Sequence, residues 1–189
     1  MKTKNIFLFV LLILINGCFS EEHINFLDVP INGSIDKFAD ELIKIGFTEA
    51  PCMEENQRKI NGVFLEKNCE IVISGSGKSN TVYKVKVNLP EESRDSLEVS
   101  FGKIQNLCSS KYGIGKSRYH QYRNSDRFHF NEPRRTRELH PGDFTRYTTA
   151  SGSIFVEILT RSISITFTDK LNSEIQKSEM DLDQESGKY

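Results

Sequence analysis

The residues best suited to chemistry lie between positions 111 and 147, where basic and aromatic side chains are interleaved. This stretch holds nine Lys/Arg against four Asp/Glu, with seven aromatic residues and three of the four histidines of the chain. Such side chains can stack on sugar rings and can pair with sulfate, phosphate or carboxylate groups. The stretch therefore predicts a surface that contacts an anion or a glycan, through Arg118, Arg123, Arg127, Arg134, Arg135 and Arg137. A solvated loop or an extra hairpin is the plainer interpretation, and both stay open at this point.

Metal binding and catalysis have less support in the sequence. The histidines of this stretch are nine and eleven residues apart, so no two of them lie one helical turn apart as metal ligands often do. Residues 74–80, SGSGKSN, resemble a phosphate-binding loop, but Val72 occupies the place of its first glycine and a strand follows, so we predict a hairpin turn. We predict no catalytic residue, no metal and no cofactor. Because catalytic groups often meet only in space, a small envelope hydrolase with an unrecognised site stays the alternative to a non-enzymatic module.

The first twenty residues indicate export and lipid attachment. Lys2 and Lys4 precede an apolar run over residues 6–15, which has the length of a signal-peptide core and is too short to span a bilayer. The run leads into Gly17 and Cys18 in a pattern that resembles the bacterial lipobox. The resemblance implies a signal peptide over 1–17, lipidation of Cys18 and a membrane as partner. An ordinary signal peptide, cleaved nearby, that leaves Cys18 as a free or paired thiol is the alternative.

Composition limits the partners further. Without residues 1–17 the chain has 172 residues, with 23 basic and 26 acidic side chains and a net charge of −3, which gives no reason to expect nucleic acid. This length suits one domain over 26–178, between a tether over 18–25 and a disordered tail over 179–189. Three cysteines are left besides Cys18, so a disulfide between Cys52 and Cys69 competes with three free thiols.

Two similar halves are expected around these residues. Residues 34–47 carry apolar side chains at i, i+3, i+4, i+7 and i+8, which predicts a helix with Ser34 as N-cap, and a second helix is predicted over 96–112. Three strands follow each helix, at 62–66, 69–74 and 81–89 and then, after an irregular segment over 114–143, at 144–149, 153–159 and 162–168. One or two helical turns are predicted over 172–178. The order predicts an α+β fold of two αβββ halves, 34–89 and 96–168, with both helices on one face of an antiparallel sheet.

Three strings that follow the lipobox, FLDVPINGSIDKFADELIKIGF, GVFLEKNCEI and VYKVKVNLP, resemble uncharacterised small lipoproteins of anaerobic gut bacteria. The resemblance covers most of residues 26–113, and it implies a fold and an address without an activity. Ser20, Glu21 and Glu22 also resemble acidic sorting signals, which favours the outer membrane and leaves its side open. We therefore expect a membrane-anchored binding or accessory module of the cell envelope, with an anionic glycan or a protein as its further partner.

Overall fold

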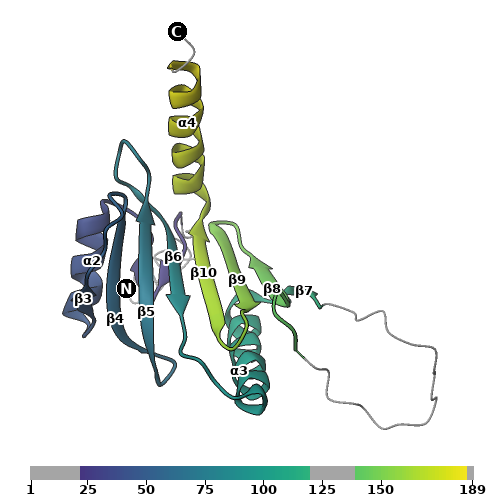
Figure 1. Cartoon of the computed structure of the whole chain (residues 1–189). Helices are drawn as coiled ribbons and strands as arrows, with labels where there is room; N and C mark the ends of the chain where they lie inside the picture. Colours follow the sequence, from purple (N-terminus) through teal and green to yellow (C-terminus); the bar gives the residue numbers. More distant parts are fainter. Residues whose placement is uncertain (1–21, 120–138, 187–189) are drawn as a thin grey trace, which may run out of the picture.

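An eight-stranded antiparallel sheet organises the part of the chain that this computed structural model describes, residues 22–119 and 139–186 (Figure 1). In spatial order its strands are β3 (Thr48–Ala50), β4 (Gln57–Phe64), β5 (Lys67–Gly75), β6 (Val82–Asn88), β10 (Ile163–Asp169), β9 (Gly152–Ile158), β8 (Phe144–Thr148) and β7 (Lys116–Arg118). The remaining elements are a hairpin of β1 (Asn25–Phe26) and β2 (Val29–Pro30), and the helices α2 (Ile35–Lys44), α3 (Arg94–Tyr112) and α4 (Lys170–Ser186).

The sheet consists of two halves that meet at β6 and β10. These two strands pair antiparallel, with Val87 opposite Ile165, and from them the earlier strands of each half run outward in reverse chain order. This arrangement confirms the predicted α+β fold. Each half has one strand more than predicted, because β3 and β7, of three residues each, extend the two edges of the sheet.

One face of the sheet carries the core. Alternate strand residues such as Ile71, Val85 and Ile165 are fully buried on this face, and the apolar sides of α2 and α3 pack on them in a single cluster. Between the two helices the β1–β2 hairpin inserts Phe26, whose ring centroid lies 5.5 Å from that of Phe64 and 5.2 Å from that of Phe167. Full burial of such a side chain contributes about 1.5–3 kcal/mol, so this covered face accounts for most of the favourable burial energy.

Both ends of the domain differ from the prediction. The predicted tether over 18–25 is too long, because Ile24 is only 2% exposed and its N–H donates to Asp169 at 3.0 Å. The predicted disordered tail over 179–189 is wrong for residues 179–186, which belong to α4. The helix is polar, and Asn172 rather than an apolar stripe holds its start, by donating to the carbonyl oxygens of Ile31 and Val82 at 2.9 and 2.8 Å. None of the helices described is long and apolar enough to cross a membrane.

Candidate functional site

The strand residues that point away from α2 and α3 form a second surface, which we call the open face. Figure 1 looks onto this face, with α3 behind the sheet and α4 projecting beyond the end of β10. The pairing register aligns one row of open-face residues across seven strands: Lys59, Val72, Lys86, Thr166, Phe155, Arg146 and Lys116. At about 4.8 Å between neighbouring strands, this row is roughly 29 Å wide.

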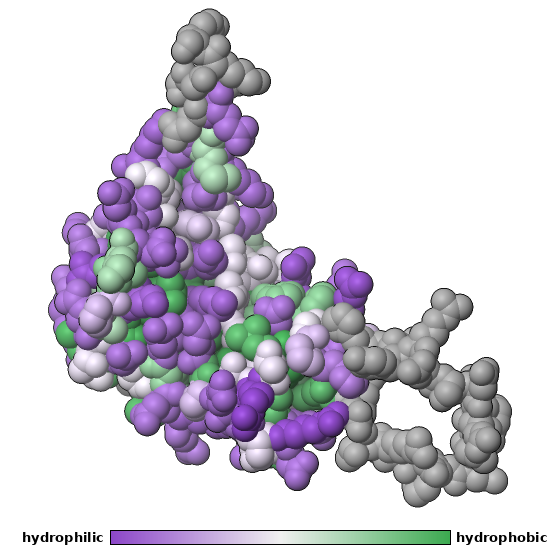
Figure 2. Space-filling view, viewed as in Figure 1, coloured by the Kyte–Doolittle hydropathy of each residue, from purple (hydrophilic) through white to green (hydrophobic). Residues whose placement is uncertain are grey.

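Basic side chains dominate the charge of the open face. Its strand positions carry six basic residues against Glu70 and Glu157, namely Lys59, Lys84, Lys86, Lys116, Arg118 and Arg146. Glu70 is already engaged, because its carboxylate lies 3.6 Å from Lys59 Nζ and accepts the Asn88 side-chain N–H at 3.2 Å. Figure 2 shows hydrophilic side chains over the β4, β5 and β6 part of this face. The face is therefore positive in a chain whose overall charge is slightly negative.

An aromatic pair interrupts this charged surface on β8 and β9. The rings of Phe144 and Phe155 lie 4.7 Å apart between centroids and are tilted by 38°. The guanidinium of Arg146 lies over the Phe155 ring, 5.3 Å from its centroid. Both rings are half-buried, so a cation and an aromatic surface are presented together to solvent. This combination can stack on a sugar ring while it pairs with an anionic substituent.

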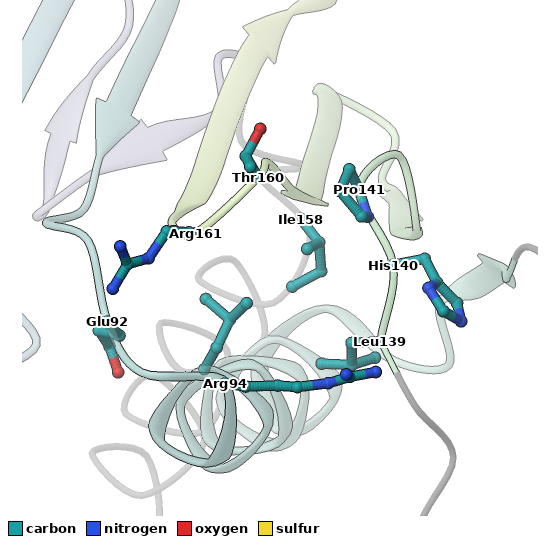
Figure 3. A pocket seen from close by; sticks show the side chains of 9 residues that line it. Glu92, Arg94, Leu139, His140, Pro141, Ile158, Thr160 and Arg161 are labelled. Carbon is teal, nitrogen blue, oxygen red and sulfur yellow. The ribbon is translucent and has the colours of Figure 1, made fainter.

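A cavity of about 510 Å³ opens where β9 ends at Ile158, between this strand end and the first turns of α3 (Figure 3). Leu97, Leu139, Pro141 and Ile158 give it apolar walls, and Figure 3 shows Ile158 pointing into it. Arg94 and Arg161 lie at two of its edges, with Glu92 and His140. The cavity is therefore an apolar hollow bordered by charge, between α3 and the end of β9 on the helix-covered side of the sheet.

Only part of the predicted site can be located. Arg118 ends β7 on the open face, opposite Phe144 in the register. The other predicted arginines lie outside the described residues, as does Cys18, and they are Arg123, Arg127, Arg134, Arg135 and Arg137. The prediction did not include Lys59, Lys84, Lys86 or Arg146. The signal for Lys84 and Lys86 in the sequence was their alternation with valines, which places both lysines on one side of a strand.

The cysteines and histidines among the described residues give no further site. Cys52, Cys69 and Cys108 are free thiols in the structure, so it does not support a disulfide between Cys52 and Cys69. Burial raises the pKa of the Cys108 thiol to about 11 and also raises that of Cys69, which opposes formation of a reactive thiolate. Within residues 22–119 and 139–186, no three His, Cys, Asp or Glu side chains are grouped as metal ligands.

One cluster has the composition of a serine nucleophile with a base. Ser100 Oγ lies 2.6 Å from Lys67 Nζ and donates to Glu92 Oε2 at 2.8 Å, and Lys67 also pairs with Glu92. A serine–lysine pair is active only when the lysine is neutral and can accept a proton. Here Lys67 Nζ donates to both Ser100 and Glu92, and the Ser100 hydroxyl donates to Glu92, so the serine proton is directed at the carboxylate and not at the lysine. The cluster therefore links β5 to the first turns of α3, and its geometry alone does not make a nucleophile.

The SGSGKSN loop between β5 and β6 binds a carboxylate of the same chain. The N–H groups of Lys78 and Ser79 donate to Glu179 of α4 at 2.8 and 3.0 Å. The Lys78 N–H, followed by the donors of Ser79 and Ser76, lowers the pKa of the Glu179 carboxyl. The loop thus forms a hairpin connection that also fastens α4 to the sheet.

Comparison with family models, with curated proteins and with solved structures finds no match to this chain. A function for it has to come from the geometry of the open face and from the sequence.

Proposed function

We propose that this chain is a lipid-anchored, non-enzymatic binding module of a bacterial cell envelope, whose open face binds an anionic glycan. The observation that carries the proposal is the row of cations and the Phe144–Phe155 pair on a sheet face over which α2 and α3 do not pack. The lipobox-like Cys18 supports the anchor, and the acidic residues after it favour the outer membrane. The resemblance to small lipoproteins of gut bacteria agrees with this address.

The shape of the surface favours a polymer over a small molecule. A row about 29 Å wide matches an extended chain, whereas small ligands usually occupy a concave and mostly apolar pocket. Sulfate or carboxylate substituents would pair with Lys86 and Arg146, and a sugar ring would stack on Phe155 beside Arg146. Since the cations are solvent-accessible, this binding should weaken as salt screens it.

Binding of heparin, as a probe for sulfated glycans, tests the proposal at increasing salt. Lys86→Glu and Arg146→Glu should each weaken binding by about tenfold. Each replaces a cation that attracts the anionic glycan with an anion that repels it, about 5 Å from the neighbouring positions of the row. Phe155→Ala should weaken binding at every salt concentration, since stacking is screened little. The matched control is Lys37→Glu on α2, an exposed lysine of the opposite layer, which should bind like the wild type.

The outcome of the control decides the interpretation. If Lys37→Glu weakens binding as much as Lys86→Glu, the interaction follows net charge and the open face is not the site. Replacing Arg134, Arg135 and Arg137 together by Ala measures the contribution of the segment predicted from the sequence. Binding that survives every one of these changes would refute the glycan proposal.

A small envelope hydrolase is the second candidate, and the 2.6 Å contact between Ser100 and Lys67 is the observation that favours it. A chromogenic ester or amide series would detect it. Turnover that Ser100→Ala abolishes and Lys86→Glu preserves would favour the hydrolase over the binding module.

A further inference from the structure

Two hairpin turns of the helix-covered side hold leucines in a backbone conformation that is rare for them. Leu27 and Asp28 connect β1 to β2 with φ of 49° and 63°, and Leu65 and Glu66 connect β4 to β5 with φ of 51° and 63°. Turns of this mirror type strongly prefer Asn and Gly, because a side chain strains the left-handed backbone. A bulky apolar residue in both turns therefore indicates that the side chains themselves are used.

Both leucines lie at the rim of one apolar cavity. This cavity has a volume of about 360 Å³, and its walls include Phe26, Phe64 and Phe167 together with Leu107 of α3. The described part of the chain leaves the rim leucines partly uncovered, since Leu27 and Leu65 are each 39% exposed and Leu107 is 52% exposed. They form a small patch of exposed apolar surface, which we call the leucine patch.

The exposed side of α3 extends the leucine patch. Val99, Lys103, Leu107 and Lys111 follow at intervals of four residues, so apolar and basic side chains alternate along one side of the helix. The charges around the patch are balanced, because Asp28 and Glu66 offset Lys103 and Lys111. Lys67, which also lies near, is paired with Glu92. Apolar side chains within a ring of balanced charge are complementary to a zwitterionic phospholipid surface.

The number of residues between Cys18 and the patch points to the occupant. Glu22, where the described chain begins, is four residues after Cys18, and an extended backbone covers at most about 3.6 Å per residue. Cys18 is therefore within about 14 Å of Glu22. The chain then enters the covered side at Ile24 and reaches the Leu27 turn three residues later. A bilayer that holds acyl chains on Cys18 is therefore within reach of this side of the domain.

We propose that the leucine patch rests in the interface of the bilayer that anchors the chain, with Leu27, Leu65 and Leu107 below the headgroups and the open face directed away from the membrane. This inference rests on the lipid anchor of the proposed function. It adds an orientation: the anchor and the patch hold one face of the sheet to the lipid and leave the other face to the glycan.

Tryptophan scanning tests this orientation directly, because the chain contains no tryptophan. Single Trp replacements at Leu27, Leu65 and Leu107 are made in the full-length chain, purified from membranes with its lipid and reconstituted into phosphatidylcholine vesicles that carry brominated acyl chains. Each should show blue-shifted emission and at least twofold quenching by the bromolipid. The control is Met53→Trp, a fully exposed position beside Lys84 and Lys86 of the open face, which should be quenched no more than free tryptophan.

A second variant separates membrane contact from folding. Leu27→Asn with Asp28→Gly gives the first turn its preferred residues and removes the leucine, so the domain should be at least as stable as the wild type. In this background the quenching of Trp at position 65 should fall by about half. Chains that float with the vesicles while positions 27, 65 and 107 are quenched no more than position 53 would overturn the orientation and leave the anchor in place. Chains that do not float would overturn the anchor, and the orientation with it.

Discussion

Replacing Asp169 by Ala should loosen the junction at which the two ends of the domain meet. The carboxylate of Asp169 is fully buried where β10 ends. It accepts the N–H groups of Ile24 and Asn172, each at 3.0 Å, and lies 3.2 Å from His23 Nδ1. One side chain therefore connects the entry of the chain, the central strand pair and the first turn of α4.

The expected loss of stability follows from the donors that the substitution leaves behind. The hydrogen bonds from Ile24 and Asn172 are buried, and a buried donor without a partner costs about 1–3 kcal/mol. Two such donors, with the lost contact to His23, give a loss of about 3–5 kcal/mol in the free energy of unfolding. For a domain of this size the melting temperature should fall by roughly 8–15 °C. Asp169→Asn keeps the shape and one acceptor oxygen, so it should lose about half as much.

Urea denaturation followed by far-UV circular dichroism measures this loss, with an unchanged slope as evidence that both variants unfold in one step. Asp181→Ala, at an exposed position of α4, is the matched control and should lie within about 0.5 kcal/mol of the wild type. If Asp169→Ala unfolds within 1 kcal/mol of the wild type, the junction does not hold the two ends together. The conclusion that the tether ends before Ile24 would then be wrong as well.

Acid should release α4 from the β5–β6 loop. The Lys78 and Ser79 donors lower the pKa of Glu179 from 4.5, so their contact stabilises the folded state above that pH and is lost as the pH falls through the lowered pKa. Amide exchange at Lys78 and Ser79, corrected for intrinsic rates, should accelerate towards pH 3 in the wild type and stay constant in Glu179→Gln. Thiol labelling at pH 8 should find Cys52 first, because a pKa of about 11 leaves roughly 0.1% of Cys108 as thiolate. In denaturant, three reactive thiols would agree with lipidated Cys18 and four would contradict it. Gly62→Ala should lower the melting temperature, since a Cβ there would overlap the Phe47 ring, whereas Gly102→Ala in open space on α3 should raise it.

Local patterns predicted the fold because burial of one face requires an apolar residue at every second position of a strand and at every third or fourth position of a helix. This periodicity is clear in the strand around Val85 and Val87 and in the helix over 34–47. The short edge strands β3 and β7 bury too few side chains to show such a periodicity. The last eight residues of α4 were also missed. Their apolar side chains are few and exposed, and this part of the helix is fastened through the Glu179 carboxylate, which accepts N–H groups of a loop about a hundred residues earlier.

The open face could be predicted only in part, because its parts come from distant segments. The sequence around Lys84 and Lys86 indicates a strand with one wet face. Nothing local connects these lysines with Phe155 or Arg146, which reach the same row only through the pairing of β6 with β10 and of β10 with β9. The strained turns at Leu27 and Leu65 were equally hidden, since neither has the Asn or Gly that usually marks such a turn.

The two proposed contacts use opposite faces of one sheet, which makes their independence a sharp test of both. Lys86 and Leu65 belong to surfaces separated by a packed layer about 10 Å thick, and among the described residues they share no partner. Distant and unconnected substitutions are usually additive. Lys86→Glu should therefore weaken heparin binding without changing the quenching of Trp at position 65, and Leu27→Asn with Asp28→Gly should do the reverse. A variant that changes both readouts together would mean that one surface serves both ligands, and the division of the sheet into a lipid side and a glycan side would be wrong.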